Sequence, residues 1–283
     1  MKFSQPNADI FVPDFSLAPA AALKRTTHLC IAAHQDDIEI MAYQGIAACF
    51  GRDDKWFSGV VVTNGAGSPR SGPYKDYTDE AMQGIRRREQ RKAAYVGDYS
   101  IQFQLAHLSA AVKNSADAGV QADLAAILAG CAPEVVYLHQ PADKHDTHIA
   151  VLSHSLKALR ALPAERRPKK VIGCEVWRDL DWMCDTDKHA LDTGAHPNIG
   201  ASLVGVFDSQ ITGGKRYDLA TAGRRLANAT YHTSHATDVY DGINWAMDLT
   251  PLVANPEYSI SEYTLAHIDR FRQDVAARLR KFA

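Results

Sequence analysis

The sequence predicts an α/β fold with a mostly parallel sheet and helices on both of its faces. Short apolar runs alternate with longer segments of helical periodicity, and this alternation is typical of parallel sheets. The 283 residues are enough to bury a sizeable core, and no internal repeat or clear domain boundary divides them. We therefore expect a single Rossmann-like domain.

The expected elements follow one another at regular spacing. Residues 1–27 are expected to form an irregular lead-in, because three prolines interrupt them, and residues 28–283 are assigned to one domain. The expected strands are 28–33, 56–63, 101–105, 134–138 and 171–176, and the expected helices are 37–50, 79–97, 119–130, 149–159, 215–230 and a last one with a capping box at Ser259 and Glu262. The strand 101–105 alternates apolar and polar residues, which predicts a half-buried strand. Residues 177–214 match no regular pattern.

Composition excludes several classes of protein. There are 31 Lys and Arg residues and 33 Asp and Glu residues, so we expect no nucleic-acid partner. No apolar run approaches the roughly 18 to 20 residues that cross a bilayer. The five cysteines are scattered without C-x-x-C spacing, which predicts neither a disulfide framework nor a thiolate metal site. With no signal-peptide pattern at the start, these features favour a cytoplasmic protein.

A first polar cluster follows the first expected strand. His34, Asp36 and Asp37 stand where that strand passes into a helix, and open α/β sheets place ligands at this edge. Adjacent carboxylates do not easily point the same way, so one can bind a metal while the other faces metal-bound water. The alternative is a solvated acidic helix start, because aspartate is favoured in a first helical turn.

A second polar cluster follows the fourth expected strand. His145 and His148 are three residues apart and share one face of a helix, and that face points into the protein. Two histidines and an aspartate at the ends of neighbouring strands match a catalytic zinc site with an open position. Ordinary surface histidines are the alternative.

These motifs together resemble the PIG-L/LmbE zinc-dependent N-deacetylases. The A-H-x-D-D signature with a following Glu stands at residues 33–39, and the H-x-x-H signature at residues 145–148. Residues 63–65 resemble the strand-end turn of the family, Arg86 and Glu89 resemble its R-x-x-E helix, and residues 231–235 loosely resemble a late A-H-R-S-Q motif. The resemblance covers residues 28–175 well and the rest thinly.

The resemblance implies a role for each matching residue. It makes His34, Asp37 and His148 the ligands of Zn²⁺, Asp36 the general base and His145 the second catalytic group, which we expect to be protonated when it holds the oxyanion. Asp36 or His145 would protonate the leaving amine. Two departures stand out: Gln35 replaces the usual proline, and Thr147 replaces an aspartate that could orient His145. Asp143 and Asp146 are the local candidates for that orienting group.

Further residues are candidates for contact with substrate. They are Arg70 in the loop after residue 63, Arg86, Trp177, His232 and His235. Two of them have a structural alternative: an Arg86–Glu89 ion pair and an aromatic anchor for Trp177. The remaining histidines, among them His139, are interpreted as structural.

Two classes of function remain. The first is a zinc hydrolase that removes an acyl group, acetyl above all, from an amide nitrogen of a small sugar or glycoconjugate, as the resemblance implies. The second is a non-catalytic metal- or nucleotide-binding α/β module. The glycines near residue 65 do not fit G-x-G-x-x-G, which disfavours a nucleotide. Either class is compatible with a homo-oligomer.

Overall fold

A computed structural model describes residues 1–283 and contains one mixed sheet of eight strands. The strands lie in the order β1-β4-β3-β2-β5-β6-β8-β7. Their bounds are β1 Asp9–Phe11, β2 His28–Ala32, β3 Phe57–Thr63, β4 Ile101–His107, β5 Val135–His139, β6 Lys170–Cys174, β7 His189–Asp192 and β8 Ile243–Asp248. The five central strands from β4 to β6 are parallel, whereas β1, β8 and β7 pair antiparallel with their neighbours. The predicted α/β class is confirmed.

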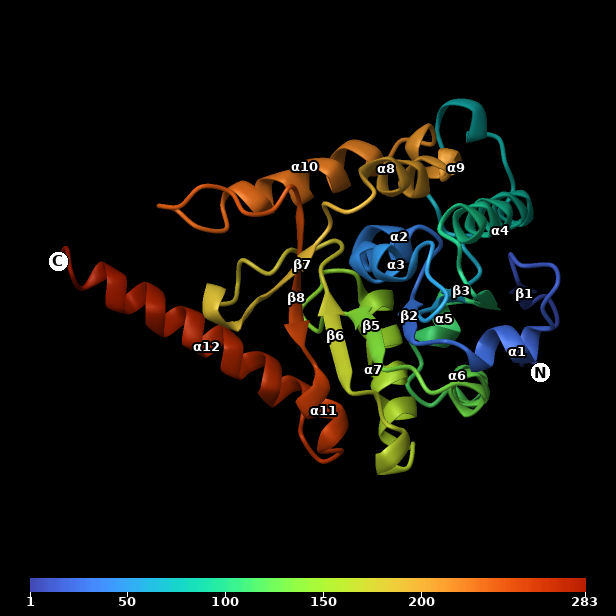
Figure 1. Ribbon diagram of the computed structural model, residues 1–283, viewed down its shortest axis with the longest axis horizontal. Helices are drawn as coiled ribbons and strands as arrows, with labels where there is room; N and C mark the ends of the chain where they lie inside the picture. Colours follow the sequence, from blue (N-terminus) through green and yellow to red (C-terminus); the bar gives the residue numbers. More distant parts are fainter.

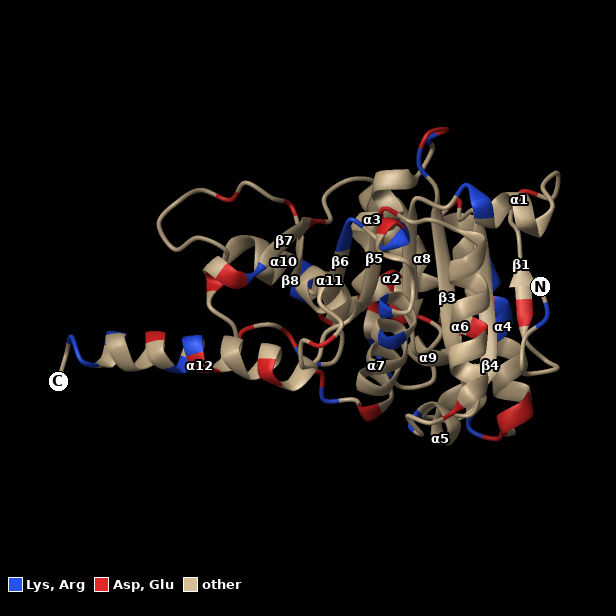
Figure 2. Cartoon of the chain, turned by 90° about the horizontal axis from the view of Figure 1, so that it is seen from below, with Lys and Arg blue, Asp and Glu red and all other residues tan.

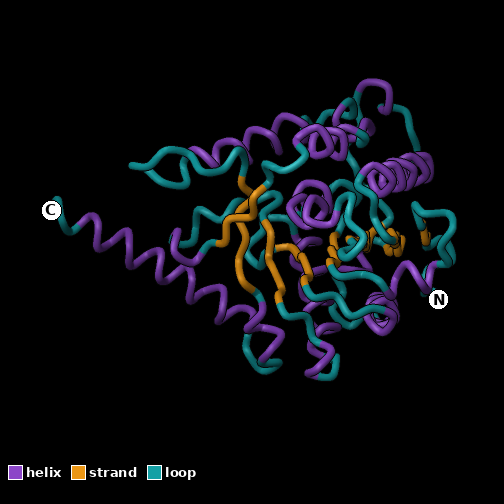
Figure 3. The backbone as a smooth tube through the Cα atoms, viewed as in Figure 1, coloured by secondary structure: helices purple, strands orange, loops and turns teal.

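Helices cover both faces of this sheet (Figures 1 and 3). On one face lie α2 (Asp37–Met41), α3 (Tyr43–Cys49), α4 (Asp79–Val96), α8 (Pro197–Gly205), α9 (Asp208–Ile211) and α10 (Tyr217–Thr230). The opposite side carries α1 (Pro19–Lys24), α5 (Ser109–Val112), α6 (Ala118–Gly130), α7 (Asp146–Arg160), α11 (Thr250–Ala254) and α12 (Ile260–Leu279). Two apolar clusters fill the two layers, with 33 and 22 buried residues. Both faces of the parallel strands are therefore buried, as such sheets require.

The lead-in is more regular than the sequence suggested. Residues 1–27 contain the edge strand β1 and the short helix α1, so the expectation of an irregular segment was wrong. Pro19 does not break α1, because it stands in the first helical turn, where its missing N–H costs nothing. Asp9 of β1 accepts a hydrogen bond from Arg91 of α4 at 2.8 Å, which ties the lead-in to the domain.

Three further expectations need correction. The predicted helix 37–50 is two helices, with a break at Ala42. The predicted half-buried strand is β4, and all of its residues are buried. Its polar positions find partners inside the protein: Gln104, for example, donates to the backbone of Arg87 at 3.1 Å. The unassigned residues 177–214 hold β7, α8 and α9.

No helix of the structure combines the length and the apolar character that a membrane span requires. All five cysteines are free, and four of them are buried.

Candidate active site

The order in which the chain adds parallel strands to the sheet reverses between β2 and β5, and the two histidine clusters meet there. The central strands follow the order third, second, first, fourth, fifth, so the chain leaves β2 toward one side and β5 toward the other. In such sheets the crevice at this point is the usual ligand site. His34, Asp36 and Asp37 follow β2, and His145 and His148 follow β5.

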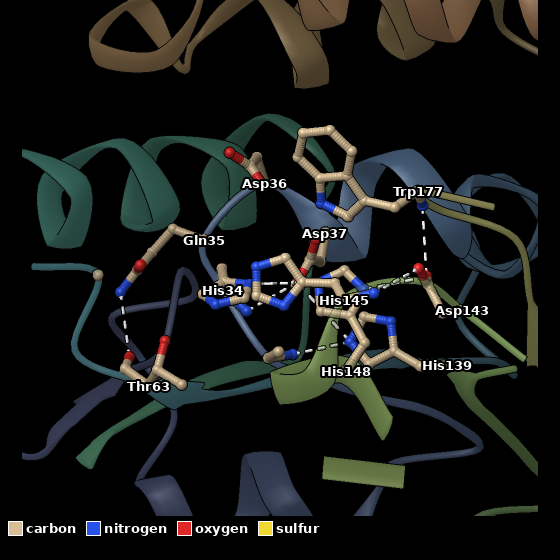
Figure 4. A network of polar contacts seen from close by, with 12 residues as sticks. His34, Gln35, Asp36, Asp37, Thr63, His139, Asp143, His145, His148 and Trp177 are labelled. Atoms are coloured by element: carbon tan, nitrogen blue, oxygen red, sulfur yellow. Dashed lines mark hydrogen bonds and ion pairs between the residues drawn. The ribbon is translucent and has the colours of Figure 1, made fainter. Parts of the chain in front are cut away.

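Three side chains converge on one small volume (Figure 4). His34 Nδ1 lies 3.1 Å from Asp37 Oδ2, and His148 Nε2 lies 3.2 Å from His34 Nδ1 and 3.3 Å from Asp37 Oδ2. Ligands that hold zinc at about 2.0–2.2 Å in a tetrahedron stand about 3.3–3.6 Å from one another. These three separations are close to that requirement, so the set fits a metal ion.

The protonation of this cluster also suits a cation. Burial would raise the pKa of Asp37, but His148 and His34 outweigh burial and hold it well below its usual range. Burial lowers the pKa of His34 to about 4, so that ring is neutral near pH 7. Burial opposes protonation of His148, yet Asp37 and Asp143 raise its pKa to about 9. His148 thus keeps a proton between two carboxylates, and a divalent ion would displace it.

Asp143 serves a different histidine from the one expected. Its Oδ2 lies 3.1 Å from His148 Nδ1, while its Oδ1 accepts only the backbone N–H of His145, at 3.2 Å. Neither of the two candidates, Asp143 and Asp146, therefore makes a hydrogen bond to the His145 ring. A carboxylate behind a metal-binding histidine fixes its tautomer and raises its basicity.

His145 is held by stacking rather than by a carboxylate. Its ring lies 4.6 Å from the His148 ring and 4.9 Å from the His34 ring, between centroids, and its buried Nδ1 has no hydrogen-bond partner. Burial and the neighbouring His148 lower the pKa of His145. The structure favours a neutral His145 ring at pH 7 over the protonated ring that the sequence suggests, and the neutral ring still offers one N–H donor.

Asp36 has an unusual backbone conformation and its own partner. Its φ of 88° lies in a region that residues other than glycine rarely adopt. Arg86 donates to Asp36 Oδ2 at 3.2 Å and to the Gln35 carbonyl at 2.7 Å, and Gln90 accepts from the Asp36 backbone N–H at 3.3 Å. Burial raises the pKa of Asp36, and Arg86 opposes that shift. Asp36 and Asp37 thus point to different partners.

Arg86 makes hydrogen bonds to several segments around the site. Besides Asp36 it binds Ser68 Oγ at 2.5 Å and the Gly65 carbonyl at 3.3 Å. Gly65 has a φ of 74°, and a Cβ there would meet Gln35 at 2.4 Å, so only glycine fits this turn. The suggested Arg86–Glu89 ion pair is absent: Glu89 instead accepts two hydrogen bonds from Ser209, at 2.7 and 2.6 Å.

Two cavities meet at the paired carboxylates. One has a volume of 520 Å³ and is lined by His34, Arg86, His145 and the loop after β3. The other has a volume of 280 Å³ and is lined by Glu175, Lys144 and Arg224. Asp36, Asp37, Trp177 and Tyr217 line both. Trp177 and Tyr217 lie edge to face, 6.1 Å apart, at the boundary between the cavities.

The structure does not bring every predicted contact residue to these cavities. Arg70 turns back onto its own loop, where it donates to the carbonyls of Tyr77 and Ala66 at 2.8 and 2.7 Å. His232 packs against Trp245, with ring centroids 5.1 Å apart, and His235 is exposed; both follow α10. None of the three lines either cavity, whereas Arg86 lines the larger one and Trp177 lines both.

Sequence reasoning missed His139 and Glu175. His139 stacks on His148 with ring centroids 3.9 Å apart, and its Nε2 lies 3.7 Å from Asp37 Oδ2. It therefore forms one metal-compatible set with Asp37 and His148, and His34, His145 and His148 form another. Glu175 directly follows β6 and is 2% exposed. Both stand at carboxyl ends of parallel strands, and that position is the signal that could have found them.

The C-terminal part of the chain holds the helix that carries Asp37. Arg225 of α10 donates to the carbonyls of Glu39 and Ile40 at 2.9 and 3.1 Å, and Asn244 of β8 donates to the Ile40 carbonyl at 3.0 Å. The last carbonyls of a helix lack partners within it, and α2 has only five residues. These donors therefore stabilise the end of α2.

Solved structures share this fold. The conserved protein TT1542 of Thermus thermophilus is similar with a TM-score of 0.58 and 17% identity, over 83% of this chain and 99% of that one. The N,N′-diacetylchitobiose deacetylase of Pyrococcus horikoshii has a TM-score of 0.57 and 14% identity, over 77% and 82%. GalB, the 4-carboxy-2-hydroxymuconate hydratase of Pseudomonas putida, has a TM-score of 0.55 and 16% identity, over 79% and 96%. At these identities the likeness establishes the fold alone.

The sequence itself matches one family. No curated protein sequence matches the chain significantly. The model of the family described as "PIG-L: GlcNAc-PI de-N-acetylase" matches residues 29–159, a segment that includes both histidine motifs, Asp36, Asp143 and Arg86. Residues 29–159, just under half of the chain, are therefore similar to the PIG-L family.

Proposed function

We propose that this protein is a zinc-dependent hydrolase that removes an acetyl or similar acyl group from an amide nitrogen of a sugar or glycoconjugate. The observation that carries the proposal is the meeting of His34, Asp37 and His148 beside a second, separately held carboxylate, Asp36. A metal-binding set and an independent proton acceptor are what metal-assisted amide hydrolysis requires. The match of residues 29–159 to the PIG-L family model supports the same reaction.

Each residue of the chain has one task in this mechanism. His34, Asp37 and His148 would hold the zinc ion, which when bound supplies a Lewis acid and lowers the pKa of water. Asp36 accepts a proton from the attacking water. A neutral His145 donates a hydrogen bond to the oxygen that becomes negative in the transition state. Asp36, which now carries that proton, then returns it to the amine that leaves.

The two cavities suit a substrate with two parts. Their junction at Asp36 and Asp37 is where the amide would lie, so the acyl and amine portions would extend into different cavities. Trp177 offers an aromatic face to both, and aromatic faces pack well against sugar rings. One of the similar structures is named as a deacetylase of N,N′-diacetylchitobiose, which favours an amino-sugar derivative. A cytoplasmic location remains a prediction from the sequence.

One observation favours a second function. The fold is as similar to a hydratase as to deacetylases, so the fold does not separate amide hydrolysis from addition of water to a double bond. A base and a metal would serve either reaction.

Metal analysis and a product assay test the proposal together. The purified protein is stripped with a chelator, reloaded with zinc, and incubated with a panel of N-acetylated amino sugars and glycosides. We expect about one zinc per chain and metal-dependent release of equal amounts of free amine and acetate. No bound metal would support the non-catalytic module. Bound zinc with hydration of unsaturated carboxylic acids, and no amine release, would support the hydratase.

A further inference from the structure

The last helix leaves the body of the molecule with one face uncovered. In Figures 1 and 2, α12 (Ile260–Leu279) projects away from the sheet and its helices. Only Thr264 and His267 of this helix are buried. Its hydrogen bonds and ion pairs to the rest of the chain end at Arg270, which lies 2.8 Å from Asp187. A single helical stretch in water is marginally stable, because most helix stability comes from packing.

The uncovered face has a regular apolar stripe. It consists of Leu265, Ile268, Val275, Leu279 and Phe282, all between 37% and 90% exposed. With Arg272 included, these positions are separated by three, four, three, four and three residues. That spacing forms one seam along a helix and is typical of a helix that packs along a second helix. Scattered surface leucines would not show it.

We propose that this stripe pairs two copies of the chain through antiparallel α12 helices. The spacing of three, four, three, four, three is the same when read from either end, so the stripe is complementary to itself in the antiparallel direction. Leu265 of one copy then lies opposite Phe282 of the second copy, Ile268 opposite Leu279, and Val275 opposite Arg272. A two-fold axis relates the two helices, which is the commonest symmetry of homo-oligomers.

Charge selects the antiparallel direction. Residues 257–270 carry Glu257, Glu262 and Asp269 against Arg270, and residues 272–281 carry Arg272, Arg278, Arg280 and Lys281 against Asp274. An antiparallel pair places the basic end of one helix beside the acidic start of the other, with Asp269 and Arg278 at the same height. A parallel pair would align like charges and like helix dipoles. The second copy is therefore a better match than an arbitrary apolar helix.

A groove at the base of α12 is within reach of the second copy. Leu265 and Ile260 of α12 and Ile149 and Leu152 of α7 line a cavity of 350 Å³ there. Phe282 lies three residues beyond Leu279, where α12 ends. In the antiparallel pair it comes opposite Leu265, which lines this groove, so Phe282 of the second copy reaches it. One pair of helices along this seam would bury less surface than a standard interface of about 1,600 Å², so we expect a dimer of micromolar affinity.

Molar mass in solution tests the pairing. Sedimentation of the full-length protein from about 1 to 100 μM should show a monomer that becomes a dimer as concentration rises. The variant Ile268→Glu, Val275→Glu should remain monomeric, whereas the control Ala277→Glu, on the opposite exposed side of the helix, should dimerise normally. Circular dichroism checks that each variant folds. A wild type that stays monomeric, or a double variant that still dimerises, overturns the proposal.

Cysteine cross-linking tests the direction. In a Cys184→Ser background, Ile268→Cys with Leu279→Cys should form disulfide-linked dimers, because the two positions face each other across the antiparallel seam. Leu279→Cys alone should not, because the two copies of this residue would stand about 16 Å apart. Efficient cross-linking by the single variant would overturn the antiparallel arrangement. The pairing is independent of the proposed reaction, so a protein that dimerises without any deacetylase activity would leave it intact.

Discussion

Asp143 Oδ2 lies 3.1 Å from His148 Nδ1, and the opposite nitrogen of the same ring lies 3.3 Å from Asp37. The ring therefore presents Nε2 to the proposed metal and donates its other N–H to a buried carboxylate. Because such a contact fixes the ring orientation and tautomer, it contributes to metal affinity without touching the metal.

We expect Asp143→Asn to weaken zinc binding by about 10- to 100-fold, as is usual when the partner of a metal-binding histidine is lost. Competition with a chromogenic chelator measures this affinity. Asp146→Asn is the matched control, because this exposed carboxylate makes no hydrogen bond to a site histidine and its loss should leave affinity unchanged. Equal affinities for the wild type and Asp143→Asn would show that the Asp143–His148 contact is structural only.

Asp36 and Asp37 should respond differently to substitution although they are neighbours. Asp37→Ala removes a proposed metal ligand, so metal content and activity should disappear together. Asp36→Asn keeps the three ligands, so zinc should remain while kcat falls by roughly 10²-fold or more, as for loss of a general base. Metal analysis beside steady-state kinetics separates the two. Loss of zinc from both variants would contradict this division of tasks.

Arg86 should set the pH range in which Asp36 acts. Its guanidinium opposes the burial that raises the pKa of Asp36, so Arg86→Gln should raise that pKa further. A base acts only when deprotonated, so the loss of kcat/KM on acidification should begin at a higher pH in the variant. A pH–rate profile at saturating zinc shows this shift, and Arg88→Gln, at an exposed position of the same helix, is the control. An unshifted acidic limb would exclude Asp36 as the group that Arg86 controls.

The sequence predicted the fold class, and it predicted that His34, Asp37 and His148 would lie together, because both follow from local patterns. Strand–helix alternation indicates a parallel sheet, and His34, Asp37 and His148 stand at strand ends that such a sheet brings together. Partner choice was not predictable in the same way. Asp143 faces His148 rather than His145 only because of how the chain turns into α7. Arg86 donates to Asp36, which is distant in sequence, and not to the nearby Glu89.

Long-range packing also determines which residues of the C-terminal part of the chain lie near the site. His232 and His235 lie in a motif-like segment, but α10 carries that segment away from the cavities. Arg225 and Asn244, which no motif marks, instead hold the end of α2. Glu175 is buried by contacts with Asn228 and Trp245, at 2.7 and 3.0 Å, that are distant in sequence.

His145 should act on the transition state and not on the metal. With its N–H directed to the developing negative charge, His145→Ala should lower kcat and kcat/KM together, by about 10²- to 10⁴-fold, with zinc content unchanged. Parallel kinetics and metal analysis check this. His189→Ala, at an exposed position on β7, should behave as wild type. A near-normal kcat for His145→Ala would make this ring a packing residue, and the donor to the oxyanion would have to be another group.

Glu175 should make the protein less stable as pH rises. Burial raises its pKa from an ordinary 4.5 to about 7, so the folded state keeps the proton over a range in which the unfolded chain loses it. The stability that the protonated Glu175 carboxyl contributes is therefore fully present below about pH 4.5 and is lost as pH rises through about 7.

The variant Glu175→Gln tests this pH dependence. It keeps an oxygen for Asn228 and Trp245 but cannot ionise, so any fixed cost of the amide is independent of pH. The free energy of unfolding of the variant relative to wild type should thus increase by about 3 kcal/mol between pH 4.5 and pH 8. Urea unfolding at a series of pH values measures it, with the exposed Glu134→Gln as the control that should show no such trend. Parallel stability curves for wild type and Glu175→Gln would mean that Glu175 is already ionised in the folded protein at neutral pH.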